Sequence, residues 1–454
     1  HTAESTMGQG QARVALEAAT KLSNATPASE SDLALFPVFW SVPFTRKDTY
    51  TEVPAKVFVG LRKTNPQKFA LLIVHVVHRL YQAVKTPDQS KNDEVLMALR
   101  MLTRLLPIAF DGSQEDSLEK TLFWENTIPE APEAVKPLLP TEEAPNAPVE
   151  QLKLPAFDGL LSGAPLAQRV VDILVRLMFL PNFTIVPIQV NKEDTISKDI
   201  DVPFKYAWAP GTFTKTVDYY NQTWQFDNHR MEVVLCLLAT LSRPIYAPPS
   251  PEPHDRWLEY LTSKKTVFTP VMFASLLNVA MRYDPVGWGV PYNHVLSQDV
   301  SEQLMNVSLE LLSVILEYKS TVQLQPAQYQ QTPAHQALHG TVAVEKPADR
   351  NIFIDLLEQL SADDHTFIFN GVLRMLNNPV VATNTLLPNS TKSVSCQQEM
   401  LTVFWQLIQL SRPFLMHILK RDEFIEIVYP VLHFVYQGRK DPAQMGQVHL
   451  GIFF

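Results

Sequence analysis

Residues 66–84 read PQKFALLIVHVVHRLYQAV, and their apolar side chains recur at steps of three and four residues. This spacing places the apolar positions on one face of an α-helix. Pro66 suits the first helical turn, where no backbone N–H is needed. Residues 93–110 repeat the pattern, with Pro107 expected to end or kink the helix, and the polar segment 86–90 joins the two. The sequence therefore predicts an antiparallel helical hairpin.

The same periodicity continues along most of the chain and predicts an all-α fold. Glycine is scarce, at 14 residues, and proline is plentiful, at 35, which suits helices joined by proline-bearing loops. About a dozen amphipathic helices, mostly paired, favour an α-solenoid of the HEAT or armadillo kind with long Pro-rich loops. No fixed repeat period is found, so a compact irregular helical domain is the alternative. Besides the hairpin, helices are predicted at residues 13–22, 164–180, 228–241 (with Asn228 as N-cap), 255–262, 271–283, 301–318, 351–360, 366–376, 397–410, 412–420, 423–436 and 442–454.

Composition divides the chain into five regions. Residues 127–163 form an acidic, proline-rich linker that is expected to be extended and mobile. Residues 321–347 form a glutamine-rich linker that is expected to be poorly ordered. They separate helical regions at 1–126, 164–320 and 348–454. The last region ends within an apolar helix and is expected to be truncated. All three helical regions are expected to form one continuous solenoid.

Some segments between or beside the predicted helices carry clear expectations about burial. Residues 33–40 hold three aromatic side chains and are expected to be buried. In the helix at 164–180, polar residues lie opposite the apolar stripe and are expected to face solvent; they are Arg169, Asp172 and Arg176. Residues 181–227 form a long irregular segment that is expected to be ordered, because aromatic residues crowd it. These are Tyr206, Trp208, Tyr219, Tyr220 and Trp224.

The titratable residues do not assemble into a known catalytic or metal-binding motif. His75 and His78 share a helix face but have no companion ligand at a suitable spacing, so they are interpreted as core or rim residues. The run Asp-Asp-His at 363–365 is interpreted as a helix cap. Cys236 and Cys396 lie in or beside apolar helical segments and are interpreted as core residues. The sequence thus predicts no enzyme, with no catalytic, cofactor-binding or metal-ligating residue.

Charge and hydropathy limit the partners and the location that can be expected. The net charge of −9, without a basic patch, argues against nucleic-acid binding. The N-terminus is polar and lacks a signal-peptide core, and no apolar run reaches the roughly 18 residues that span a bilayer. The chain is expected to be cytoplasmic or to lie on a membrane from its cytosolic side.

Residues 283–296, YDPVGWGVPYNHVL, hold two prolines, two glycines, two tyrosines and one tryptophan in fourteen residues. Proline fixes φ, and glycine permits backbone angles that a β-carbon forbids, so the backbone is tightly specified here. Two interpretations stay open: a rigid connector between helices, or a loop that binds a partner. The residues concerned are Asp284, Pro285, Gly287, Trp288, Gly289, Pro291, Tyr292, Asn293 and His294.

This segment closely resembles part of the high-temperature-induced dauer-forming protein family, relatives of dymeclin. A second segment, LPNSTK at 387–392 leading into QEMLTVFW at 398–405, resembles another part of that family. Shorter similarities are NHRME at 228–232, LTRLLP at 102–107 and HLGIF at 449–453. Family members are longer, and this chain resembles their N-terminal portion. The second segment contributes Leu387, Pro388, Asn389, Ser390, Thr391 and Lys392 as candidate site residues.

The resemblance implies a non-enzymatic peripheral scaffold of the Golgi and trans-Golgi network, needed for secretory trafficking, protein sorting and dense-core vesicle biogenesis. It implies protein partners at Golgi membranes, weak or indirect membrane association, no cofactor and no small-molecule substrate. One alternative is a transport-receptor-like solenoid that binds extended peptide cargo. Another is an enzyme with its site at residues 284–294, where Tyr292 or His294 would be the acid–base group.

The resemblance also raises the question of N-terminal acylation. Family members resemble one another in beginning Met-Gly with Ser or Thr at the sixth position, the N-myristoylation pattern. Here Met7-Gly8 is the corresponding pair, but the sixth position counted from Met7 is Ala12, so the pattern is incomplete. The chain as written is therefore expected to bind anionic membranes poorly.

Overall fold

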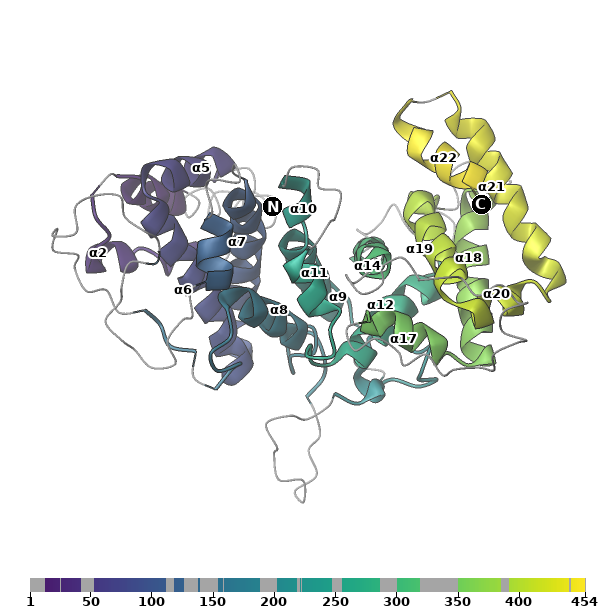
Figure 1. Ribbon diagram of the computed structural model, residues 1–454, viewed down its shortest axis with the longest axis horizontal. Helices are drawn as coiled ribbons and strands as arrows, with labels where there is room; N and C mark the ends of the chain where they lie inside the picture. Colours follow the sequence, from purple (N-terminus) through teal and green to yellow (C-terminus); the bar gives the residue numbers. More distant parts are fainter. Residues whose placement is uncertain are drawn as a thin grey trace, which may run out of the picture. The chain divides into compact units, whose positions relative to one another are not determined.

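The computed structural model describes residues 13–24, 26–41, 53–111, 118–125, 138, 154–157, 159–187, 202–218, 221, 223–246, 255–285, 300–318, 350–384, 392–440 and 442–453 (Figure 1). Regular structure within these residues is helical, apart from one isolated β-bridge between Pro181 and Ile185. The predicted all-α class is confirmed. The glutamine-rich linker 321–347, and residues 127–137, 139–153 and 158 of the acidic linker, lie outside the described part of the chain.

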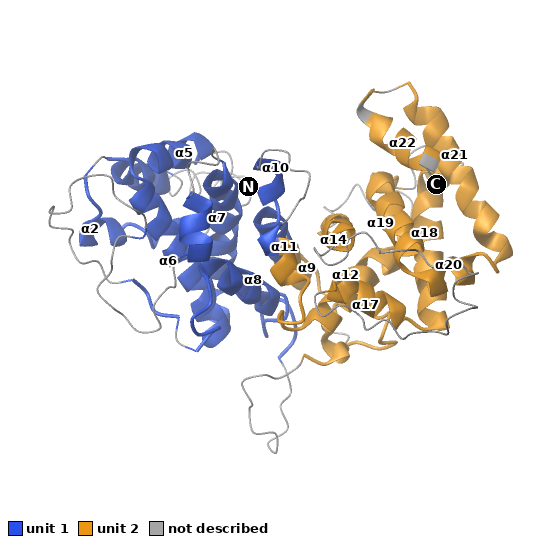
Figure 2. Cartoon of the chain, viewed as in Figure 1, with its two compact units in different colours: residues 1–188, 232–257 blue, residues 189–231, 258–454 orange. Residues whose placement is uncertain are grey.

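The chain forms two compact units. Unit 1 comprises residues 1–188 and 232–257, and unit 2 comprises residues 189–231 and 258–454 (Figure 2). Two helices, α9 (Trp224–Thr240) and α11 (Arg256–Leu261), contribute residues to both units.

The predicted helical hairpin is the centre of unit 1. Helix α6 (Pro66–Lys85) packs against α7 (Asn92–Phe110), with the short 3₁₀ helix η1 (Gln89–Lys91) between them. Asn65 caps α6 by accepting the backbone N–H of Lys68 at 3.1 Å, and Pro66 occupies the first turn as expected. Pro107 does not end α7, which continues through it to Phe110. The other elements of unit 1 are a helix at 13–22, α2 (Glu30–Leu33), α3 (Val38–Ser41), α5 (Ala55–Thr64), the π-helical turn η2 (Lys120–Glu125), α8 (Leu166–Leu177) and α10 (Arg243–Tyr246).

Burial in unit 1 follows the apolar pattern closely but differs on α8. The apolar faces of α6 and α7 are buried, as are Phe36, Phe39 and Trp40. The expectation that the polar face of α8 is solvent-exposed is wrong, because Arg169 and Asp172 are fully buried. For Arg169 the reason is tertiary: its guanidinium lies over the Phe157 ring and donates to the Phe157 carbonyl at 3.1 Å.

Unit 2 is built from neighbouring helices that pack on one another. Helix α12 (Thr269–Arg282) packs on α14 (Val300–Glu317), α14 on α19 (Gln397–Leu410), α18 (Ala362–Thr383) on α19, and α21 (Ile425–Gly438) on α22 (Met445–Phe453). The remaining elements are η3 (Phe204–Tyr206), α17 (Ile352–Glu358), α20 (Arg412–Ile418), η5 (Asp422–Phe424) and η6 (Pro442–Gln444).

The irregular segment 202–218 of unit 2 is ordered against α12, as its aromatic content predicted. Tyr206 and Trp208 are buried. Asn278 of α12, which is 0% exposed, holds the segment. Its Oδ1 accepts from the backbone N and Oγ1 of Thr212 at 2.7 and 2.6 Å, and its Nδ2 donates to the carbonyls of Ala209 and Thr212 at 3.0 and 3.2 Å. The burial expected for Trp224 is wrong, since its side chain is 74% exposed; Tyr219 and Tyr220 lie outside the described residues.

Two helix starts differ from the sequence-based expectation because other caps are used. Helix α9 begins at Trp224, and Asn228 lies inside it; Thr223 precedes the helix and accepts the Phe226 N–H at 3.4 Å. Helix α18 begins at Ala362, four residues before the predicted start at 366, because Ser361 and Asp364 form a capping box at this earlier position. It also continues through Pro379 to Thr383, beyond the predicted end at 376.

Candidate functional site

Helix α18 holds the described ends of both segments on which the family resemblance depends. Of the first segment, Asp284 and Pro285 are described, whereas Gly287, Trp288, Gly289, Pro291, Tyr292, Asn293 and His294 lie outside the described residues. Of the second, Lys392 is described, whereas Leu387, Pro388, Asn389, Ser390 and Thr391 are not. The structure therefore shows where the chain enters the first segment and where it leaves the second.

The entry to the first segment is fixed by Arg374 of α18. Its Nη2 donates to the Met281 carbonyl at 2.6 Å and its Nε to the Tyr283 carbonyl at 3.0 Å. These carbonyls lie at the C-terminal end of α12, where helices leave such groups without intrahelical partners. Burial lowers the pKa of Arg374, an effect that the neighbouring carboxylate of Asp284 opposes.

A glycine allows α18 to approach this point closely. A β-carbon at Gly371 would lie 2.6 Å from the Met281 carbonyl oxygen and 2.9 Å from its Cα. Contacts this short with backbone atoms are not tolerated, so only glycine fits unless the helices move apart. Gly371 therefore sets the distance at which Arg374, one turn further along α18, reaches the end of α12.

The exit of the second segment is held by the same helix. Asn378 donates from Nδ2 to the Lys392 carbonyl at 3.0 Å and accepts the Val394 N–H at 2.9 Å. The Lys392 ammonium pairs with Glu302 in the first turn of α14, the helix that follows the first segment. Since Gly371, Arg374 and Asn378 are spaced by three and four residues, they lie on one face of α18. We name these three residues the α18 anchor.

The anchor was not found from the sequence, although one signal pointed to it. The sequence predicts a helix at residues 366–376, and nothing in that pattern selects Arg374 or Asn378. Gly371 in the interior of that helix is a recognised sign of close backbone approach. The anchor positions two chain segments through neutral and charge-assisted hydrogen bonds with backbone carbonyls and with the Val394 N–H.

Replacing Arg374 by lysine is expected to destabilise unit 2 by about 1–2 kcal/mol and to loosen the end of α12. A lysine ammonium is a point donor and does not reproduce the fork that reaches both the Met281 and Tyr283 carbonyls. Urea unfolding gives the stability, and hydrogen exchange of residues 279–285 reports the local loosening. Arg412→Lys, at an exposed arginine of α20, is the matched control, and equal behaviour of the two variants would contradict the anchor.

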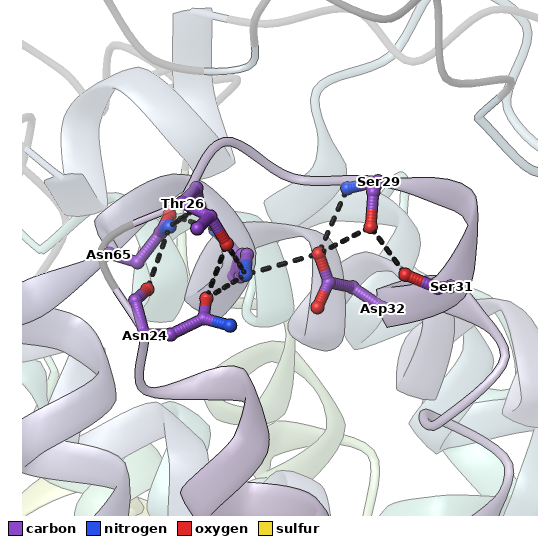
Figure 3. Close-up of polar contacts among 7 residues, drawn as sticks. Asn24, Thr26, Ser29, Ser31, Asp32 and Asn65 are labelled. Atoms are coloured by element: carbon purple, nitrogen blue, oxygen red, sulfur yellow. Dashed lines mark hydrogen bonds and ion pairs between the residues drawn. The ribbon is translucent and has the colours of Figure 1, made fainter.

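A second polar cluster, in unit 1, surrounds the fully buried side chain of Lys68. Its Nζ lies 3.1 Å from Asp32 Oδ2, 2.5 Å from Asn24 Oδ1 and 3.4 Å from Thr26 Oγ1, which uses its three donors. Asp32 also accepts from the backbone N and Oγ of Ser29, both at 2.9 Å (Figure 3). Because its donors are already used inside the cluster, Lys68 is suited to hold residues 24–32 on α6 and not to act on a ligand.

His75 and His78 lie where the sequence placed them, at the edge of the α6 core. The His75 ring is 5.1 Å from that of Phe36, and the His78 ring is 5.3 Å from that of Phe157. In the part of the chain that the structure describes, no three histidine, cysteine or acidic side chains are grouped as metal ligands. Burial, followed by the charge of His78, lowers the pKa of His75 to about 4.

This shift predicts that acid destabilises unit 1 through His75. The unfolded chain takes up the proton near its ordinary pKa of 6.5, whereas the folded chain does so only near 4. The contribution of His75 to the free energy of unfolding is therefore fully present above pH 6.5. It falls by about 1.4 kcal/mol per pH unit between pH 6.5 and about 4. At pH 5 the loss from this group is about 2 kcal/mol. His75→Phe keeps an aromatic ring beside Phe36 and is expected to lose less stability than wild type between pH 7.5 and 5 in urea unfolding. Identical pH dependence of the two chains would refute it.

A cavity of about 590 Å³ in unit 1 lies where the C-terminal end of α6 meets the start of α7. Its lining carries more positive than negative charge, with Arg79, Lys85 and Lys91 against Asp88. Arg79 is already paired with Glu94 at 2.9 Å. The hollow is polar and its charge favours small anions over cations.

The other reactive side chains singled out in the sequence serve packing or capping. Cys236 and Cys396 are buried, and burial raises the pKa of each thiol to about 12, which suppresses the nucleophilic thiolate. Asp364 belongs to the capping box of α18 as its third helical residue, so the cap interpretation is confirmed for Asp364 alone. Asp363 instead pairs with Lys215 at 2.8 Å. His365 is buried, with its ring 5.5 Å from that of Phe414.

Comparison with known proteins gives one family. The model of the high-temperature-induced dauer-formation protein family matches residues 7–454. The chain is 30% identical over 437 residues to protein HID1 of Mus musculus and, equally, to protein HID1 of Homo sapiens, covering 94% of this chain and 51% of each relative. It is 21% identical over 513 residues to the Ubp5-interacting protein ftp105 of Schizosaccharomyces pombe, covering 98% of this chain and 52% of the relative. The chain thus spans about half the length of these relatives. No solved structure matches it.

Proposed function

Because this chain belongs to the high-temperature-induced dauer-formation protein family, we propose that it is a non-enzymatic, peripheral scaffold protein of the Golgi and trans-Golgi network. In this proposal it acts in secretory trafficking, protein sorting and dense-core vesicle biogenesis. The observation that carries the proposal is the family match over residues 7–454, together with 30% identity to protein HID1 of two mammals. Because the chain spans about half of those relatives, the activity of a whole family member is part of what is proposed.

The helical architecture supports a scaffold. Helices that pack in pairs, such as α6 with α7 and α12 with α14, are the unit from which α-solenoids are built, and we propose a HEAT-like arrangement. Such folds offer long surfaces to protein partners without reaction chemistry. The name of the fission-yeast relative states that it interacts with Ubp5, which agrees with a protein partner for this chain.

The polar clusters support a non-enzymatic role. The α18 anchor, the Lys68 cluster and the Asp363–Asp364 cap each use their charged groups on backbone atoms or on one another. Buried polar groups used in this way stabilise a single arrangement of the chain. Among the helices that the structure describes, none has the length and apolar content that crossing a bilayer requires.

The proposal is tested by locating a fluorescent fusion of the chain in secretory cells. We expect overlap with a trans-Golgi marker that disperses when the Golgi is dispersed, and co-purification of Golgi coat or tether proteins. Uniform cytosolic fluorescence, or recovery of a defined soluble cargo instead of Golgi proteins, would count against it.

A variant with Gly371→Leu, which pushes α18 from the end of α12, should lose the partners while the Arg412→Lys control keeps them.

The unmodified chain is expected to remain in the supernatant with anionic liposomes at physiological salt. Its net charge is −9, and Arg13 and Lys21 are isolated cations near its start. Even an acyl chain gives only marginal membrane binding unless a second signal accompanies it. The unmodified chain in this experiment carries no acyl group. Co-sedimentation at two salt concentrations measures this. Strong, salt-sensitive binding by the unmodified chain would show a membrane-binding face that the proposal does not include.

A further inference from the structure

Helix α21 in unit 2 is apolar on two faces. Its inner face consists of Ile427, Pro430, Val431, Phe434 and Gly438, which are buried, and the helix packs on α18 and α22. Glycines bring α22 very close: a β-carbon at Gly451 would lie 2.6 Å from Val435 Cγ2. Its polar residues, Glu426, His433 and Gln437, lie together on one side between these two faces. An apolar face of a helix is ordinarily buried against a neighbour.

The outer face of α21 is nonetheless exposed. Four large side chains on it are Ile425, Tyr429, Leu432 and Tyr436, with 69%, 62%, 62% and 59% of their surface exposed. Their spacing of four, three and four residues is the pattern of a seam between two packed helices. We name these four residues the α21 stripe. A contiguous apolar surface of this kind marks an interaction site more often than a solvated surface.

We propose that the α21 stripe binds the α21 stripe of a second copy of this chain, with the two helices antiparallel. The stripe is symmetric about the midpoint between residues 430 and 431. In an antiparallel pair, Ile425 of one copy therefore lies against Tyr436 of the other, and Tyr429 lies against Leu432. The two-fold axis generates each of these contacts twice. This self-complementarity is what an isologous dimer interface requires.

One pair of opposite charges beside the stripe follows the same symmetry, whereas exposed Glu426 has no charged residue at its equivalent position, 435. Exposed Asp422 precedes it, in η5, and exposed Arg439 follows it at the equivalent distance from the midpoint. The antiparallel pair places the carboxylate of one copy opposite the guanidinium of the other, whereas a parallel pair would oppose like charges. Arg439 lies 4.1 Å from the Tyr436 ring, so its charge is held over the seam. Arg421, which the pairing brings toward Lys440, is already paired with Glu423 at 3.3 Å.

The size of the surface sets the strength of the dimer. A seam formed by a single helix of 14 residues lies at the low end of specific interfaces, below about 1,200 Å² in total. We therefore expect a dissociation constant on the order of 10 μM, with rapid exchange between monomer and dimer.

Sedimentation equilibrium of the chain between about 1 and 200 μM spans that dissociation constant. The wild-type chain should convert from monomer to dimer over this range, and Leu432→Asp should raise the dissociation constant by about 30-fold or more. Leu432 is exposed, so the substitution leaves the fold intact. Ile245→Asp, at an exposed isoleucine of α10 outside the stripe, is the matched control and should dimerise as wild type does. A wild-type chain that stays monomeric to 200 μM, or a Leu432→Asp chain that still dimerises, overturns the proposal.

Two further variants test the antiparallel arrangement itself. Asp422→Arg and Arg439→Asp should each weaken the dimer, and the double variant should recover it. A short bis-maleimide should cross-link a mixture of Ile425→Cys and Tyr436→Cys chains. Either variant alone should stay uncross-linked. In the antiparallel pair, residue 425 of one copy and residue 425 of the other are offset along the helix axis by eleven residues, about 16 Å, and the same holds for residue 436. Cys236 and Cys396 are buried and do not compete. Cross-linking of Ile425→Cys with itself would indicate a parallel pair and overturn the arrangement.

Discussion

Replacing Asn278 by alanine is expected to destabilise unit 2 by about 3–5 kcal/mol. The amide of Asn278 makes four hydrogen bonds to residues 209–212 and is completely buried. Without it, the N–H of Thr212 and the carbonyls of Ala209 and Thr212 lose their partner where water cannot replace it. Each buried polar group left in this way costs about 1–3 kcal/mol, more than a hydrogen bond ordinarily contributes.

Urea unfolding followed by circular dichroism measures the loss, and hydrogen exchange of the Thr212 amide locates it. Because the chain has two units, exchange is the more direct measurement, since unfolding need not be two-state. Asn306→Ala is the matched control: this half-buried amide on α14 has an oxygen without a hydrogen-bond partner, so its removal should change stability little. If both variants unfold together and the Thr212 amide stays protected, residues 202–218 are held by the burial of Tyr206 and Trp208 and by their other hydrogen bonds, such as that from the Trp208 N–H to Ser275, and not by Asn278.

Asn278 also shows why long-range contacts could not be predicted from this sequence. Periodicity placed residue 278 in a helix, and that helix is confirmed as α12. Its hydrogen-bond partners are 66 to 69 residues earlier in the chain, in a segment without regular structure. A polar residue in an apolar helix indicates that a partner exists, but not which one.

Local pattern was sufficient for helix type and for several boundaries. The helix predicted at 397–410 coincides with α19, and the predicted hairpin coincides with α6 and α7 to within one residue at each end. The failures at α9 and α18 came from capping, because Thr223 and Ser361 satisfy the first backbone N–H groups earlier than expected. The failure at α8 came from tertiary cover, which periodicity does not record.

The site residues named from the sequence stay a prediction, and only the ends of the two family-like segments are described. The family-like segments led to Asp284 and Lys392, and the structure places the described ends of both segments on the α18 anchor. The anchor itself needed the structure, because Arg374 and Asn378 are unremarkable in sequence and act on backbone atoms of distant residues. Of the short similarities, NHRME at 228–232 proved informative, since it ends in Glu232, which is buried and ion-paired.

Replacing Arg100 by methionine is expected to destabilise unit 1 by about 3–5 kcal/mol. Arg100 of α7 donates from Nε to Glu232 of α9 at 2.8 Å, and the two side chains are only 7% and 2% exposed. Methionine keeps the length and the apolar contacts of the arginine stem. The expected loss therefore comes from the carboxylate of Glu232, which is left buried without its counter-charge.

Replacing both partners separates this cause from a loss of packing. The double variant Arg100→Met with Glu232→Leu removes both charges of this pair, and we expect its stability to return to within about 1 kcal/mol of wild type. Lys120→Met, which removes one partner of the exposed Lys120–Glu125 pair in the same unit, is the control and should leave the urea midpoint unchanged. If the double variant is as unstable as Arg100→Met, α7 and α9 depend on the shape of the two side chains. If it recovers, the Arg100–Glu232 pair fixes one arrangement of α7 and α9 more than it adds stability.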